Sequence, residues 1–180
     1  MALDALENEI LTLRDRAKVL QRSHGNATRE IESDTSLSAT GKEDAKKRSY
    51  DSHRASLREL RQREEQLISS KIQELQGRID STSGRTAADI IAFRDAQDRA
   101  DRIAKPEQAQ PMLERAIRQN DTSLAHAIFR RAIENGWRSV QDAFTAHRPE
   151  LTDVVRDLNR LNALKENSFE RTMQYAFILR

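Results

Sequence analysis

The chain has 180 residues, of which 33% are charged and 37% hydrophobic. Globular domains average about 25% charged and 45 to 50% apolar residues, so this chain has more surface per residue, as a long helix pair does. Its 31 basic and 29 acidic residues give a net charge of +2, which by itself does not indicate a nucleic-acid-binding surface. The absence of cysteine excludes disulfides and thiolate zinc sites.

The first predicted element is a helix over about residues 2–23, which extends to about residue 33 if Gly25 and Asn26 do not end it. Apolar residues, with one histidine among them, recur along this helix at alternating steps of three and four residues. This spacing is that of the apolar seam of a heptad coiled coil. The residues are Leu3, Leu6, Ile10, Leu13, Ala17, Leu20, His24, Ala27 and Ile31. His24 on this seam is interpreted as a polar residue that sets register.

A second, longer helix is predicted over about residues 41–80, after a polar linker at 33–41. The spacing of Thr40 and Glu43 predicts a capping box at its start. Its apolar stripe runs from Ala45 to Ile79, with one shift of phase between Leu60 and Ile72. The short linker favours an antiparallel hairpin, and a parallel dimer remains the alternative.

The remaining residues predict a compact bundle of smaller helices. All but one of the aromatic residues lie beyond residue 85, and large rings fill a many-sided core better than a two-helix seam. Helices are expected over about 86–105, 112–119 and 122–134, then in a short segment before Pro149, and from there to near residue 180. We therefore predict an all-α fold, with a coiled-coil-type hairpin arm at 1–82 and a bundle at 83–180.

No arrangement of residues here demands a particular chemistry. The chain lacks glycine-rich phosphate loops and the nucleophile elbow of hydrolases. Its four histidines do not lie at helical metal-ligand spacing, and we expect structural roles for them: His24, His53, His126 and His147. The sequence thus predicts a protein that is not an enzyme and that has no metal, cofactor or small-molecule substrate.

One charged pattern on the second helix is a candidate nucleic-acid contact. Lys47, Arg54, Arg58 and Arg61 follow one side of the helix, and such a stripe could track a phosphate backbone. Acidic residues at both ends of the stripe favour the alternative, an ordinary solvated face.

Two apolar sets are candidates for contact with a partner or with a second copy. One is the first-helix seam, and the other is the residues near 180, which are unusually apolar for a chain end. The second set either closes the core of the bundle or docks on another subunit. The candidate contact residues are Leu3, Leu6, Ile10, Leu13, Leu20, Tyr175, Phe177, Ile178 and Leu179.

The stretch from Leu124 to Trp137, followed by Val140, Phe144, Arg148 and Pro149, resembles a segment of small helical proteins encoded among the virion-structure genes of tailed phages of actinobacteria. The resemblance covers residues 120–165. It implies a structural or capsid-assembly component that acts through helix–helix contacts.

On this interpretation the partners are copies of the chain or other virion proteins, and the alternative function is nucleic-acid binding through the basic stripe. The first residues are acidic and lack the pattern of a signal peptide, and no apolar run is long enough to cross a membrane. We therefore expect no membrane partner, and a location in the host cytoplasm during assembly and then in the virion.

Overall fold

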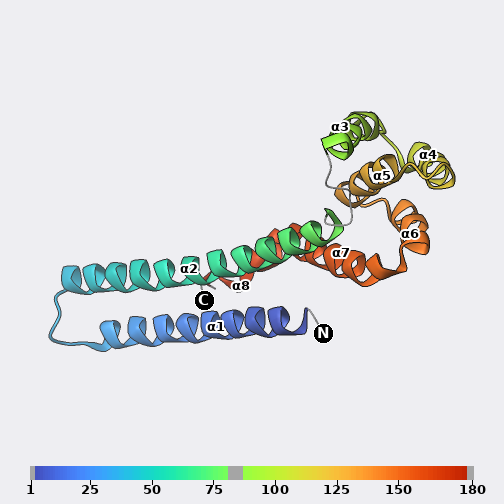
Figure 1. Cartoon of the computed structure of the whole chain (residues 1–180). Helices are drawn as coiled ribbons and strands as arrows, with labels where there is room; N and C mark the ends of the chain where they lie inside the picture. The colour runs from blue at the N-terminus through green and yellow to red at the C-terminus, as the bar shows by residue number, and fades with distance from the viewer. Residues whose placement is uncertain (1–2, 81–86, 178–180) are drawn as a thin grey trace. The chain divides into compact units, whose positions relative to one another are not determined.

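The computed structural model of the chain describes residues 3–80 and 87–177, and in this part all the regular elements are helices (Figure 1). The predicted all-α fold with a long N-terminal helix pair is confirmed. Contacts within the chain define two units: residues 1–70 with 163–180 form unit 1, and residues 71–162 form unit 2. This division differs from the predicted boundary after residue 82, because the C-terminal segment groups with the helix pair.

Unit 1 is built on α1 (Asp4–Ser33) and the first part of α2 (Ala39–Asp80), which lie side by side and antiparallel (Figure 1). Three cross-helix contacts fix the direction, because residue numbers rise along one helix as they fall along the other. They are Glu9 with Arg63 at 3.4 Å, Ser23 with His53 at 3.4 Å, and Glu32 with Lys46 at 3.2 Å. The seam is therefore closed within the chain.

The turn between the two helices is shorter than predicted. α1 continues through Gly25 to Ser33, and α2 begins at Ala39. The Ser38 hydroxyl accepts a hydrogen bond from the Gly41 amide at 3.1 Å, so Ser38 occupies the N-cap position. The predicted capping box from Thr40 to Glu43 is wrong, because this earlier serine already satisfies a first-turn amide.

The single final helix predicted from residue 149 is interrupted. The structure has a 3₁₀ turn at Pro149–Leu151, then α7 (Thr152–Glu166) and α8 (Ser168–Gln174). Asn167 lies between the two helices, and its side chain accepts a hydrogen bond from the Glu170 amide. An asparagine that caps the next turn competes with the helix ladder at its own position, which separates α8 from α7.

Unit 2 is organised around α5 (Thr122–Glu134), which packs against α3 (Ala87–Asp101), α4 (Pro106–Arg118) and α6 (Arg138–His147). Six consecutive residues of α5, 124–129, are buried. A helix that is buried nearly all round belongs at the centre of a bundle.

Two predicted helix starts in unit 2 have different outcomes. The predicted start at Met112 is wrong, since α4 begins at Pro106, where a proline costs no hydrogen bond. The predicted start of α3 at Thr86 lies outside the described residues.

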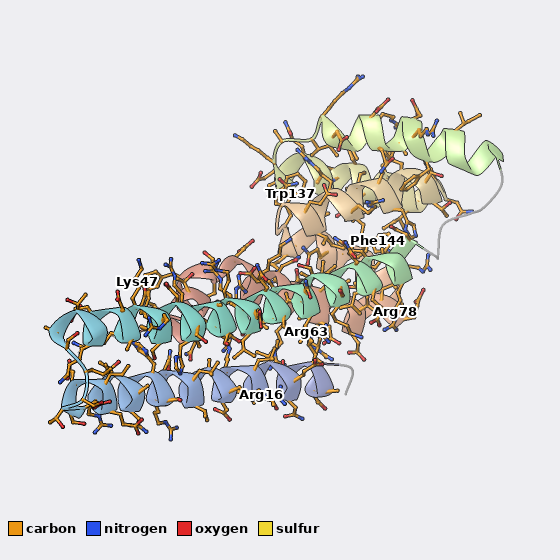
Figure 2. The ribbon with its side chains drawn as sticks, turned by 90° about the vertical axis from the view of Figure 1, so that its left-hand side faces the viewer. Arg16, Lys47, Arg63, Arg78, Trp137 and Phe144 are labelled. Carbon is orange, nitrogen blue, oxygen red and sulfur yellow. The ribbon has the colours of Figure 1, made fainter. Side chains whose placement is uncertain are left out.

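The core of unit 2 combines stacked rings with a buried amide pair. Phe129 and Phe144 stack with ring centroids 4.0 Å apart; Figure 2 labels Phe144 and Trp137 in this unit. Gln141 is 1% exposed; its amide donates to the Ala132 carbonyl at 2.9 Å and accepts from Asn159 at 2.6 Å. These bonds satisfy polar groups that would otherwise destabilise the interior.

Two helix ends have the left-handed backbone that stops a helix. Asn120 has φ of 56° after α4, and Gly136 has φ of 68° after α5. The Trp137 amide donates to the Ala132 carbonyl at 2.8 Å, which completes a Schellman motif. The predicted ends of α4 and α5 are confirmed, and α5 is capped by the Asp121 side chain, which accepts a hydrogen bond from the Leu124 amide.

We expect opposite effects from alanine at two glycines. Gly136→Ala should lower the free energy of unfolding by about 1 kcal/mol, because a side chain disfavours the left-handed region. Gly25→Ala should raise it by about 0.5 kcal/mol, because Gly25 is inside α1, where a Cβ would meet no atom within 4 Å. Urea denaturation of both variants measures this, and destabilisation by Gly25→Ala would contradict the described course of α1.

Candidate functional site: a basic groove on unit 1

A groove of about 400 Å³ lies between α2 and the C-terminal segment, within unit 1. α2 contributes one wall, and residues of α8 and those that follow it contribute the other. The lining residues are Tyr50, Arg54, Leu57, Arg58, Arg61, Thr172, Tyr175, Ala176 and Phe177. The groove thus brings together three of the four residues of the predicted basic stripe and two of the predicted partner-contact residues.

The α2 wall carries three guanidinium groups. Arg54 and Arg58 are exposed and have no ion pair with any described residue, whereas Arg61 lies 2.9 Å from Glu65. Lys47 is exposed on the same side of α2, turned away from α1 (Figure 2), but does not line the groove. The wall therefore presents at least two uncompensated positive charges.

Aromatic rings close one end of the groove. The Tyr50 and Phe177 ring centroids are 5.2 Å apart, and the Arg54 guanidinium lies 5.9 Å from the Tyr50 ring. Behind them, His24 lies 4.4 Å from Phe177 and 5.4 Å from His53. Burial lowers the pKa of His24, and the nearby His53 lowers it further, so the neutral imidazole is favoured in this cluster.

The base of the groove is formed by Tyr175, which is 6% exposed and packs on Ala17 and Leu57. Its hydroxyl donates to Glu64 Oε2 at 2.6 Å. Glu64 itself is fully buried, and its carboxylate also accepts two hydrogen bonds from the Arg14 guanidinium, at 3.2 and 2.8 Å. This paired geometry is the strong form of an arginine–carboxylate contact.

The electrostatics of this network favour an ion pair and a neutral phenol. The hydrogen bond to Glu64 is the main cause of a raised pKa for Arg14. The pKa of Tyr175 is raised well above its usual range, first by burial and then by its hydrogen bond to Glu64. The phenol thus stays protonated and acts as a donor.

Further hydrogen bonds hold the C-terminal segment on the helix pair. The Gln21 amide of α1 donates to the carbonyls of Gln174 and Ala176 at 3.1 and 2.6 Å. Arg171 is buried; its guanidinium donates to the last carbonyls of α7 and lies 3.6 Å from Glu65. Glu65 is consequently shared between Arg61 and Arg171.

The predicted partner-contact residues have contacts within the chain. Leu3, Ile10, Leu13 and Tyr175 are buried, and Leu6, Leu20 and Phe177 are half-buried. Ile178 and Leu179 lie outside the described residues. Of the two alternatives for the chain end, closure of the bundle core does not hold for Tyr175, which packs on α1 and α2 of unit 1. Docking on another subunit stays a prediction.

Sequence patterns did not predict the roles of Glu64, Arg14, Gln21 and Arg171. A signal for Glu64 exists, because it lies four residues after Leu60 and four before Ile68, on the apolar stripe of α2. The stripe was interpreted as shifting phase there, whereas the structure places a buried carboxylate at that position.

The chemistry available in the groove is binding of an anion with an apolar or aromatic part. Among the described residues, no group of three or more histidine and carboxylate side chains could hold a metal ion. Within the same residues, no helix is both long enough and apolar enough to cross a membrane. Comparison with known protein families, with curated proteins and with solved structures finds no match to this chain.

We expect Tyr175→Phe to change how stability depends on pH. Because the pKa of Tyr175 is raised in the folded state, its contribution is complete below about pH 10, the usual pKa of tyrosine. Above that pH the unfolded chain releases the proton first, so the wild type should lose stability by up to about 1.4 kcal/mol per pH unit from this group.

Urea denaturation between about pH 8 and pH 11 measures this difference, since other groups titrate alike in both proteins. The variant should be less stable by about 1 to 2 kcal/mol at pH 8, from the lost hydrogen bond to a charged group, and the gap should narrow as the pH rises. A gap that stays constant to pH 11 would show that the phenol is not buried against Glu64.

Proposed function

We propose that the chain is a non-enzymatic structural or assembly protein that joins copies of itself, or other proteins, through helix–helix contacts. The observation that supports this proposal is an apolar outer face on α8. Phe169 and Met173 are 77% and 51% exposed. They are four residues apart and therefore share one face of the helix.

The inner face of the same helix explains why these side chains are held in place. Arg171 on that face is buried and donates to α7, and Tyr175, the residue that follows α8, is buried and donates to Glu64. A segment anchored in this way presents Phe169 and Met173 with little freedom, which lowers the entropic cost of a contact. Complete burial of each side chain would contribute about 1.5 to 3 kcal/mol.

A second copy is the simplest occupant, because a twofold contact brings the same patch of each copy together. Four large apolar side chains would then meet at its centre. A particle of a tailed phage is the setting that we propose for this assembly, on the resemblance of residues 120–165 to proteins of such particles. The capsid, the tail and other virion proteins supply the alternative partners.

The test is light scattering of the full chain over a range of concentrations, with Phe169→Gln/Met173→Gln beside the wild type. The wild-type mass should rise above the 20.7 kDa of one chain as concentration increases, and the variant should remain at one-chain mass. The control is Leu11→Gln/Val19→Gln, which removes two α1 side chains of similar exposure, 56% and 61%.

The control variant should associate as the wild type does, because its side chains are two turns apart and form no continuous patch. A wild-type mass of 20.7 kDa at every concentration would contradict self-assembly. Equal association of wild type and the α8 variant would contradict the role of this face.

A further inference from the structure

We infer that the groove of unit 1 is a binding site for single-stranded nucleic acid. In this arrangement Arg54, Arg58 and Arg61 hold phosphates, and the rings of Tyr50 and Phe177 contact a base. This function is separate from assembly through α8, because the groove and the Phe169–Met173 face use different side chains.

Two of the three arginines have charges that no described carboxylate neutralises, whereas Arg61 is paired with Glu65. Arg54 and Arg58 are exposed, and neither forms an ion pair with a described residue. On a helix that rises 1.5 Å per residue, the steps from Arg54 to Arg58 and on to Arg61 advance about 6 and 4.5 Å. A guanidinium binds phosphate through two parallel hydrogen bonds, so these side chains can hold successive groups of a flexible strand.

The base contact rests on the rings at the end of the groove. Tyr50 is 37% exposed, lines the groove together with Phe177, and lies within 6 Å of the Arg54 guanidinium. Strands are held without sequence preference by this combination of cations and stacking rings. An acidic peptide would match the arginines, but its carboxylates would leave the aromatic end without a partner.

The size of the groove favours a single strand over a duplex. At about 400 Å³ it is near the lower end of pockets that hold small ligands, which suits a nucleotide. A duplex keeps its bases stacked and paired, so their faces cannot reach a ring, whereas single strands offer them.

Acidic groups nearby weaken the site but do not cancel it. Glu65 is paired with Arg61 and lies 3.6 Å from Arg171, and Glu64 is buried below with Arg14. Asp51 is exposed on the same helix beside Tyr50. The guanidinium groups of Arg54 and Arg58 remain in excess, which predicts binding that is weak and sensitive to salt.

The experiment is fluorescence anisotropy of labelled oligo-dT and oligo-rU of about 12 nucleotides with the full chain at low salt. Arg54→Ala/Arg58→Ala should weaken binding at least tenfold and reduce the salt slope by about 1.4, the value for two phosphates on a single strand. The matched control is Arg16→Ala/Arg48→Ala. It removes two exposed arginines of unit 1 that have no ion pair with a described residue, and it should change binding less than threefold.

The ring contact has its own pair of variants. Tyr50→Phe should bind as the wild type does, whereas Tyr50→Leu should bind about tenfold more weakly, as expected for the loss of one stacking contact. Circular dichroism checks that each variant keeps its helices. Tighter binding of either oligo-dT or oligo-rU than of a duplex of the same length supports the site.

Several results would overturn the proposal. One is no binding at about 100 µM protein in low salt, because non-specific nucleic-acid contacts have Kd values of about 1 to 100 µM at physiological salt and bind more tightly at low salt. Another is an equal loss for Arg54→Ala/Arg58→Ala and for its control. Competition by polyglutamate as strong as that by oligo-dT would instead assign the groove to an acidic protein partner. Equal binding by Tyr50→Leu and Tyr50→Phe would show that no base stacks on the Tyr50 ring.

Discussion

The buried carboxylate of Glu64 is the constraint on which unit 1 depends. An ion taken out of water costs several kcal/mol unless a partner compensates for it. Arg14 supplies the opposite charge from α1, and Tyr175 supplies a hydroxyl from the C-terminal segment. Three segments that are remote in sequence must therefore meet at one point. The hydrogen bond from Tyr175 to Glu64 also places Ala176 and Phe177 beside the arginines of α2. The groove therefore forms because Tyr175 is held at the Glu64 carboxylate.

The helices were predictable because their signals are local. The three-and-four spacing from Leu3 to Leu20 predicted α1 and its buried face, and the range 122–134 predicted for the next central helix matches the bounds of α5. Glu64 was not predictable in its role, since its partners are 50 and 111 residues away, and nothing near it in sequence indicates them. Asn167 divides the last predicted helix because its side chain caps α8. In sequence, an asparagine that caps a helix looks the same as an asparagine inside one, so this break was not predicted.

Sequence patterns predicted the arginine stripe and the apolar chain end of the candidate site, but not that the two lie side by side. The arginine stripe could be derived from helical periodicity, and the apolar chain end could be recognised from composition. What periodicity cannot give is their adjacency, which arises when Tyr175 packs on Ala17 and Leu57. Lys47 shows the difference: it has the spacing of the stripe but lies beyond the groove. The C-terminal segment in turn serves two surfaces, with Thr172 facing the arginines and Met173 exposed on the other side.

Unit 2 is contiguous in sequence, whereas unit 1 is assembled from residues on both sides of it. During synthesis, 111 residues separate Glu64 from Tyr175, which at about 5 to 20 residues per second is roughly 6 to 22 s. Throughout that interval α1 and α2 lack the phenol, and Glu64 must keep water or Arg14 as its partner. The bundle can fold first as a complete body. The helix pair can reach its final state only after unit 2 has been synthesised, so a chain that stops within unit 2 leaves Glu64 without the hydroxyl of Tyr175.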